Sequence, residues 1–457
     1  MNLELLTSIT ALDGRYRSKV GELDTYVSEF GLLKYRTLVE LKWFAHMAQT
    51  PGIGELPPLS SEVCAELERK SAGFGLDDAA AIKAFERTTN HDVKAVEYFV
   101  KDIIAGIPEI QQHLEFVHFG CTSEDINNLA YALMLKHSRD EVLLPLVEQL
   151  IAAIADLSDR FKATPMLSRT HGQTASPTTV GKELANFVYR LNRQKKQMQN
   201  CPMLGKFNGA VGNFNAHMVA YPELDWPSIT SIFIESLGLN VNPLTTQIEP
   251  HDYIAEYFHS IVRFNQIMID FNRDIWAYIS LGYFSQRAVE GETGSSTMPH
   301  KVNPIDFENS EGNLGLGNAL MLHIADKLMI SRWQRDLSDS TVLRNTGTCL
   351  AHSVLSYKSA LKGISKLQLN TSCLDHDLGQ SWEVLSEAVQ TVMRKHGIPN
   401  AYEKLKELTR GKQIDESLYL EILKNLDLPE PAKDALSKLT PAKYVGLAEE
   451  LSRLASE

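Results

Sequence analysis

The chain has 457 residues, of which 44% are hydrophobic and 22% charged, a composition typical of globular proteins that excludes a disordered or collagen-like chain. Its 45 basic residues (Lys and Arg) and 57 acidic residues (Asp and Glu) give a net charge of −12, which argues against a general binder of nucleic acids or anionic membranes. This length corresponds to about three domains of roughly 150 residues each.

The five cysteines are spread along the chain without a CxxC pair, so they indicate neither a disulfide framework nor a zinc site. The first residues lack the basic segment and apolar core of a secretion signal. No uncharged apolar run reaches the length of a membrane span. We therefore expect a cytoplasmic protein without a membrane partner.

Glycine and proline punctuate the chain unevenly, and this spacing predicts the helices. Proline and glycine between positions 51 and 58 break the first 115 or so residues into short helical pieces. Long helices are expected at 125–144 (ending at Pro145), 146–162, 182–200, 251–281 and about 350–361 (ending near Gly363). In the segment 251–281, apolar residues recur every three or four positions, and its 31 residues would form a helix about 46 Å long.

Strand signals are weak. Pieces rich in β-forming residues, such as 228–234, are short and isolated, and no strand–helix–strand alternation indicates a parallel sheet. We therefore predict an all-α fold with an N-terminal helical domain (1–115), a central long-helix bundle (116–365) and a C-terminal helical domain (366–457). A helix of about 46 Å exceeds what a domain of this size buries alone, so oligomerisation is favoured over a single-chain bundle.

The segment 291–304 has the most unusual composition. Glycines and serines fill its first half, and two prolines with His300, Lys301 and Asn303 fill its second half. A loop of this kind suits an active-site lid. The alternative is a solvated linker, but linkers seldom concentrate two serines, a lysine and an asparagine between prolines, so a functional loop is favoured.

Four other polar clusters have a functional and a structural interpretation. A histidine side chain can both give and take a proton near neutral pH, so His171 in the segment 168–173 could transfer one, although a lone histidine is more often structural. The segment 122–125 has the pattern of a helix N-cap, and such a helix end can also hold a carboxylate or phosphate. The segments 13–16 and 90–92 are consistent with ordinary turns.

Basic residues gather between 327 and 344. Arg335 and Arg344 lie there with Ser340, and arginines beside hydroxyl groups make a phosphate site plausible. If this segment is considered only as a cluster of charged residues, a solvated helix face is the simpler interpretation. The sequence contains no P-loop, dinucleotide fingerprint, HExxH metal motif or GxSxG elbow.

Three of these segments together resemble the active-site regions of the fumarase/aspartase superfamily. The segment 294–304 looks like its signature loop, and Thr122-Ser123 and the segment 170–173 resemble the other two regions, in the same chain order. His300, with the segments 13–16 and 90–92, makes the chain most similar to the adenylosuccinate lyase family in its bacterial form. The resemblance covers essentially the whole chain.

The resemblance implies a three-domain, all-α fold whose central bundle is completed in a homotetramer, with active sites shared between subunits. It implies cleavage of adenylosuccinate to AMP and fumarate, and of succinyl-aminoimidazole carboxamide ribotide to its carboxamide and fumarate, in purine biosynthesis. It implies these small-molecule substrates as partners, with no nucleic acid, no cofactor and no metal.

The resemblance also assigns roles to residues. Ser295 is the implied base, with an alkoxide stabilised by loop N–H groups and Lys301, and His171 is the implied acid that protonates the leaving nitrogen. The implied substrate-binding residues are Arg15, Tyr16, Asn90, His91, Asp92, Thr122, Ser123, Gln247, Ser296, Lys301, Asn303, Asn309, Arg335, Ser340 and Arg344.

Two alternatives remain open. Another fumarate-releasing lyase of the superfamily, such as argininosuccinate lyase, fumarase or aspartase, shares the loop, but its substrate has no phosphate for Arg15, Arg335 and Arg344. A non-catalytic helical scaffold is the other alternative, and the combination of Ser295, Lys301 and His171 argues against it.

Overall fold

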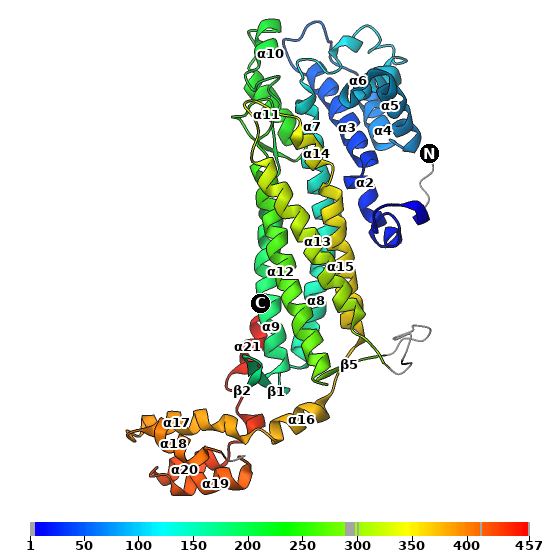
Figure 1. Ribbon diagram of the computed structural model, residues 1–457. Helices are drawn as coiled ribbons and strands as arrows, with labels where there is room; N and C mark the ends of the chain where they lie inside the picture. The colour runs from blue at the N-terminus through cyan, green and yellow to red at the C-terminus, as the bar shows by residue number, and fades with distance from the viewer. Residues whose placement is uncertain (1–4, 288–297, 299–300, 412–413, 456–457) are drawn as a thin grey trace. The chain divides into compact units, whose positions relative to one another are not determined.

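The computed structural model describes residues 5–287, 298, 301–411 and 414–455 (Figure 1). Packing divides the chain into two compact units. Unit 1 comprises Met1–Val147, Gln194–Gln266 and Gly312–Ser356, and unit 2 comprises Glu148–Arg193, Ile267–Glu311 and Tyr357–Glu457. Five long helices begin in one unit and continue into the other: α8 (Leu144–Arg160), α9 (Val180–Asn200), α12 (Asp252–Ser280), α13 (Ile305–Leu328) and α15 (Thr346–Lys366).

Unit 1 contains the N-terminal helices and three short helices from later in the chain. These are α1 (Arg17–Val20), α2 (Asp24–Val27), α3 (Glu29–Ala48), α4 (Ser61–Ala72), α5 (Leu76–Thr89), α6 (Asp92–Ile104), α7 (Ser123–Ser138), α10 (Asn215–Ala220), α11 (Trp226–Ser236) and α14 (Ser338–Leu343). Two short parallel strands, β3 (Leu204–Gly205) and β4 (Asn240–Val241), also lie in this unit.

Helix α3 is the centre of the unit 1 core. Ser28 caps its start by accepting a hydrogen bond from the Gly31 amide at 3.2 Å. Trp43 on α3 is fully buried, and its ring centroid lies 4.2 Å from that of Phe207 and 5.0 Å from that of Phe233 on α11. Aromatic packing of this kind fixes α11 against α3.

The long helices pack against one another in each unit. In unit 1, Asn265 Nδ2 donates to Asn318 Oδ1 at 2.9 Å and to Ser353 Oγ at 3.0 Å, which joins α12 to α13 and α15. In unit 2, the ring of Phe271 on α12 lies 5.5 Å from that of Phe187 on α9. The predicted helix at 251–281 is confirmed, since α12 spans Asp252–Ser280.

Two predicted helix ends are wrong, and one segment rich in β-forming residues is helical. The helix does not end at Pro145. A π-helical turn (Arg139–Leu143) leads into α8, and the proline lies in the first turn of α8, where its missing backbone N–H is tolerated. The segment 228–234 is helical in α11, capped by Asp225, which accepts from the Ser228 amide at 3.2 Å. Gly363 lies inside α15, where a Cβ would approach the Phe307 ring to 2.8 Å.

Unit 2 contains a β-hairpin that the sequence did not predict. Strand β1 (Pro165–Thr170) pairs antiparallel with β2 (Gln173–Thr179), and β5 (Phe284–Gln286) pairs antiparallel with β6 (Leu367–Leu369). The C-terminal helices follow: α16 (Thr371–Gly379), α17 (Ser386–Lys395), α18 (Ala401–Thr409), α19 (Glu416–Asn425), α20 (Glu430–Ser437) and α21 (Ala448–Ser452). The described residues are thus mainly helical, as predicted.

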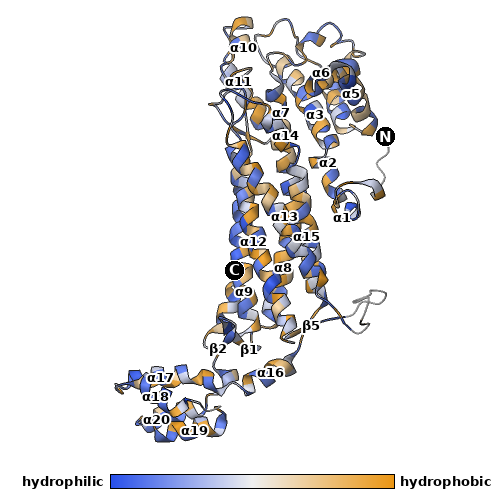
Figure 2. Cartoon of the chain, viewed as in Figure 1, coloured by the Kyte–Doolittle hydropathy of each residue, from blue (hydrophilic) through white to orange (hydrophobic). Residues whose placement is uncertain are grey.

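The C-terminal helices share a small apolar core. Leu385, Met393 and Leu423 are buried in it, and the Trp382 and Tyr419 rings lie 5.6 Å apart. Figure 2 shows apolar and polar residues alternating along these helices and along the long ones. Among the described residues, none of the helices combines the length and apolar character that crossing a membrane requires.

Candidate active site

A polar hollow of about 560 Å³ in unit 1 brings two predicted site segments together. It is lined by Thr89, His91, Lys94, Glu97, Tyr98, His118, Cys121, Thr122 and Ser123. His91 belongs to one predicted cluster and Thr122 and Ser123 to another, so the fold places residues about 30 positions apart around one cavity. Charged and hydroxyl side chains lining one hollow suit a polar, anionic ligand.

Two helices begin at this hollow. His91 is the N-cap of α6, and its Nδ1 accepts a hydrogen bond from the Lys94 amide at 3.2 Å. Thr122 is the N-cap of α7, and its amide donates to Asp125 Oδ2 at 2.8 Å. The partial positive charge of two helix N-termini favours a negatively charged ligand there.

Asp125 holds Thr122 in place through a fully buried ion pair. Its Oδ1 lies 2.9 Å from Lys206 Nζ, and neither side chain is exposed. The same oxygen accepts hydrogen bonds from the Asn208 amide at 3.0 Å and the Gly209 amide at 3.3 Å. With its charge paired and its oxygens hydrogen-bonded, Asp125 is a rigid support for the start of α7.

His118 is a residue of this hollow that the sequence did not single out. Its Nδ1 lies 2.5 Å from Oε1 of Glu40, whose side chain is fully buried on α3. Burial alone would lower the pKa of His118, but the charge of Glu40 and its hydrogen bond outweigh burial and raise this pKa above its usual value. The Glu40 carboxylate therefore favours the protonated form of His118 and balances its charge. No local pattern could have revealed this, because Glu40 lies 78 residues away.

Asp92 and Arg344, both predicted, form a second cluster in unit 1. Asp92 Oδ2 accepts hydrogen bonds at 2.8 Å from Nη2 of both Arg344 and the buried Arg36. Burial would raise the pKa of Asp92, but Arg36 above all holds it below its usual value. Arg344 Nη1 also lies 2.6 Å from Glu29 Oε2, so a phosphate at Arg344 would have to compete with two carboxylates.

Arg335, Gln247 and Ser340 form a third cluster. Arg335 Nη1 donates to Gln247 Oε1 at 3.4 Å, and Gln247 Nε2 donates to the Ala210 carbonyl at 3.1 Å. The Ser340 amide donates to Asp339 Oδ1 at 2.6 Å, which links Ser340 to the acid that flanks Arg335. The structure therefore connects these three predicted residues through side chains of the chain itself.

The remaining predicted residues of unit 1 lie at the surface. Arg15 is exposed before α1, with its Cζ 5.8 Å from the ring centroid of the half-buried Tyr16. Asn90 ends α5 in the left-handed region, with a φ of 48°, and is exposed. Their positions leave them accessible to a ligand.

The predicted acid and the described part of the signature loop lie in unit 2. His171 is exposed at the turn of the β1–β2 hairpin, with a φ of 54°. Lys301 and Asn303 precede α13, and Lys301 is exposed. Asn309 on α13 accepts a hydrogen bond at 2.8 Å from Ser359 on α15. The predicted residues Ser295 and Ser296, and His300, lie outside the described residues.

Side chains of the C-terminal helices hold both strands of the hairpin that carries His171. On β1, Arg169 donates to Asp377 on α16 and, at 3.2 Å, to the Tyr283 hydroxyl. On β2, Ser176 donates to Glu387 on α17, which also accepts a hydrogen bond from the Tyr444 hydroxyl at 3.0 Å. The hairpin is therefore anchored on both sides of its turn.

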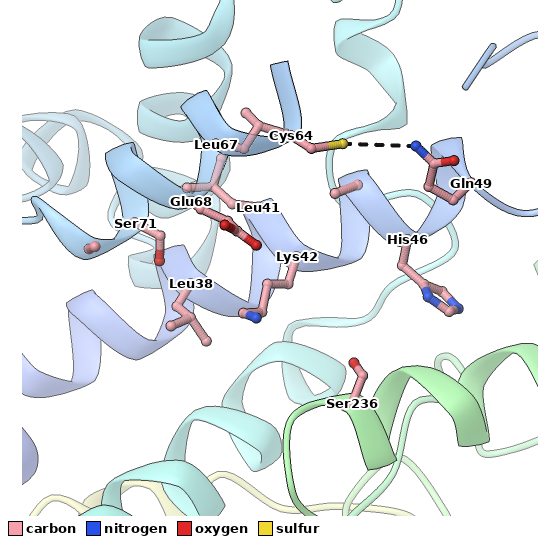
Figure 3. A pocket seen from close by; sticks show the side chains of 12 residues that line it. Leu38, Leu41, Lys42, His46, Gln49, Cys64, Leu67, Glu68, Ser71 and Ser236 are labelled. Carbon is pink, nitrogen blue, oxygen red and sulfur yellow. Dashed lines mark hydrogen bonds between the residues drawn. The ribbon is translucent and has the colours of Figure 1, made fainter. Parts of the chain in front are cut away.

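Unit 1 also has an apolar hollow of about 490 Å³ (Figure 3). Leu38 and Leu41 of α3 and Leu67 of α4 line it, and Gln49 Nε2 lies 3.8 Å from Cys64 Sγ at its edge. None of the predicted site residues lines this hollow, so the polar hollow is the candidate site. Among the described residues, no three His, Cys, Asp or Glu side chains are grouped as a metal site requires.

Comparison with known proteins identifies the family. Residues 15–318 match the family described as Lyase, and residues 331–445 match the family described as Adenylosuccinate lyase C-terminal. Proteins named adenylosuccinate lyase are similar over 98–99% of both chains: those of Haemophilus influenzae (58% identical over 451 residues), Vibrio cholerae (56% over 453) and Escherichia coli K12 (55% over 448). The chain belongs to the adenylosuccinate lyase family.

Two solved structures of more distant proteins are similar in fold to this member of the adenylosuccinate lyase family. The 3-carboxy-cis,cis-muconate lactonizing enzyme of Pseudomonas putida has a TM-score of 0.73 at 21% identity, covering 95% of this chain and 96% of that one. The β-carboxy-cis,cis-muconate cycloisomerase of Acinetobacter calcoaceticus has a TM-score of 0.73 at 16% identity, covering 97% and 99%. At such identities these structures share the fold alone. The resemblance predicted from the sequence motifs is confirmed.

Proposed function

We propose that the chain cleaves adenylosuccinate to AMP and fumarate, and succinyl-aminoimidazole carboxamide ribotide to its carboxamide and fumarate, in purine biosynthesis. The observation that carries this proposal is the identity of 55–58% with adenylosuccinate lyases across 98–99% of the chain. The polar hollow supports it, because the substrates of both reactions are polyanions of small size. The reaction is a β-elimination, for which the chain has candidate groups at each step.

His171 is the proposed acid of this elimination. It protonates the leaving nitrogen as the C–N bond breaks, and an imidazole suits this role because it can both carry and release a proton. Its exposure at a hairpin turn lets a substrate approach the ring. Ser295 is the proposed base for the Cβ proton, and Lys301 and Asn303 bind the carboxylate onto which the carbanion charge delocalises.

The other predicted residues, which lie mostly in unit 1, are proposed to bind the substrate. Thr122, Ser123 and His118 lie around a hollow with two helix N-termini and a raised histidine pKa, so they suit a succinyl carboxylate. Gln247 and Ser296 are proposed to bind the same part of the substrate, and Asn90, His91 and Asp92 to line the site. The phosphate and ribose are assigned to Arg15, Tyr16, Arg335, Ser340 and Arg344. Asn309 is a weaker candidate, since Ser359 already occupies its amide oxygen.

We further propose that the enzyme is a homotetramer whose active sites combine residues of different subunits. The long helices expose large apolar side chains, with Trp276 on α12 at 47% and Leu316 on α13 at 57% exposure, and such residues are stabilised by packing against other helices. A cytoplasmic location fits the substrates, because phosphorylated nucleotides do not cross membranes unaided.

Fumarate release from a panel of substrates tests the proposed activity. The purified enzyme is incubated with adenylosuccinate, succinyl-aminoimidazole carboxamide ribotide, argininosuccinate, malate and aspartate. We expect fumarate from the first two alone. Fumarate from argininosuccinate, malate or aspartate in place of these would assign the chain to another reaction, and none from any substrate would favour a non-catalytic scaffold.

A further inference from the structure

Glu124 is a buried carboxyl group beside Arg335 that the proposed mechanism does not use. It follows Ser123 in the first turn of α7, and only 1% of it is exposed. Its Oε2 lies 3.1 Å from Arg335 Nη2 and accepts a hydrogen bond from Asn127 at 3.4 Å. Within the described part of the chain, its Oε1 is buried without a hydrogen-bond partner. An ionised oxygen in that position is costly, so a proton on it is favoured.

Asp339 brings a second carboxylate to the same guanidinium. Its Oδ2 lies 3.5 Å from Arg335 Nε, and its side chain is 5% exposed. Arg335 therefore supplies one positive charge to two buried carboxylates. If both carboxylates are ionised, the group of three carries a net negative charge away from solvent, which is unfavourable.

The neighbouring titratable groups do not cancel this excess negative charge on Glu124 and Asp339. Lys206, which follows β3, also acts electrostatically on Glu124, but its ammonium already pairs with Asp125 at 2.9 Å. Tyr131 on α7 and Tyr253 on α12 also interact with Glu124, but burial raises both of their pKa values, so they are neutral at pH 7. Burial, opposed by Arg335, raises the pKa of Glu124 to about 7.

We propose that Glu124 positions Arg335 for the anionic end of the substrate and takes up one proton from solvent when that anion binds. The inference rests on the proposed function, in which Arg335 binds the nucleotide phosphate. A phosphate at Arg335 adds negative charge close to Glu124, and a like charge favours the protonated carboxyl. The proton makes Glu124 an O–H donor, neutralises the excess charge and leaves the guanidinium to the phosphate.

Calorimetry on the full-length enzyme counts this proton directly. AMP is titrated at about pH 8, where its phosphate is almost wholly dianionic, in buffers of different ionisation enthalpy. We expect an uptake approaching one proton per site with AMP and none with adenosine, which lacks the phosphate. If AMP binds without proton uptake, the proposal is overturned, whatever any variant does.

The pH profile of KM provides a second test. For adenylosuccinate, we expect the wild-type KM to rise by up to about tenfold per pH unit above pH 7, whereas in Glu124→Gln the rise is lost because the amide does not titrate. Glu141→Gln is the matched control, since Glu141 is exposed on the same continuous helix, and it should follow the wild type.

The outcomes separate this inference from the proposed function. A Glu124→Gln profile that rises as the wild type does would overturn the role of Glu124 while leaving the enzyme an adenylosuccinate lyase. Absence of fumarate release by the wild type, or of any AMP binding, would overturn both.

Discussion

The guanidinium of Arg169 on β1 donates a hydrogen bond of 2.6 Å from Nη2 to Oδ2 of Asp377 on α16. Two residues further along the chain, His171 occupies the left-handed region with a φ of 54°. A residue other than glycine remains in that region only when its surroundings hold it there. The Arg169–Asp377 pair therefore lets a C-terminal helix position the proposed acid.

Asp377→Asn should loosen the hairpin and lower kcat. The amide keeps the shape of the side chain but loses the charge that binds Arg169, so we expect kcat to fall on the order of tenfold with KM nearly unchanged, because a small displacement of a catalytic group slows the chemical step. Hydrogen exchange of residues 165–179 should become faster. Asp375→Asn, an exposed position on the same helix, is the control. Equal kcat and exchange in both variants would show that the pair does not position His171.

His171→Ala should reduce turnover more than binding. Without an acid, the leaving nitrogen departs as an anion, so we expect kcat to fall by about 10²- to 10⁴-fold while KM changes little. Steady-state kinetics on adenylosuccinate measures both constants, and His376→Ala, at an exposed histidine of α16, controls for loss of a surface imidazole. An unchanged kcat with a raised KM would make His171 a binding residue.

Ser295→Ala should abolish turnover while the substrate still binds. Removal of the hydroxyl leaves no base for the Cβ proton but keeps Lys301 and Asn303 available to the carboxylate. Calorimetric binding of adenylosuccinate to the inactive variant and a fumarate assay measure the two properties. Ser285→Ala, an exposed serine of β5, should retain activity. Near-normal kcat in Ser295→Ala would refute its role as the base.

Mixing of two inactive variants tests whether active sites are shared between subunits. Ser295→Ala and His171→Ala tetramers are dissociated together and reassembled. If Ser295 and His171 of one site come from different chains, some sites combine two intact residues, so activity should partly return. Each variant treated alone is the control and should stay inactive. Mixed tetramers without activity would place both residues in one subunit.

The His118–Glu40 pair should make stability depend on pH. Because its folded pKa is raised, protonated His118 contributes stability that is fully present below its unfolded pKa of about 6.5 and is lost as pH rises through the folded pKa. Glu40→Gln should therefore lower the free energy of unfolding by about 2 kcal/mol near pH 6 and by less near pH 9.

Urea denaturation at both pH values measures this difference. Glu115→Gln is the control, because Glu115 pairs with Lys101 but is 93% exposed, and it should change stability little at either pH. A destabilisation by Glu40→Gln that is equal at both pH values would mean that the charge of His118 does not contribute.

Local patterns identified the candidate site residues and most of the long helices. The segment 294–304 and His171 are recognisable because the groups they supply are close together in sequence, and α12 follows from spacing and the absence of glycine and proline. Pro145 and Gly363 misled the prediction, because a proline is tolerated in a first helical turn and a glycine can serve a close contact with Phe307. The division into three domains and the site roles remain predictions.

The sequence by itself determined the family, the reaction type and the candidate residues, because these depend on residue types at short spacing. Tertiary structure decided which of them meet. The pairs His118–Glu40 and Arg344–Asp92 join residues 78 and 252 positions apart, and the hairpin that presents His171 is held by residues of α16 and α17. Such contacts arise only when helices pack, and packing also sets the burial that raises the pKa of Glu124.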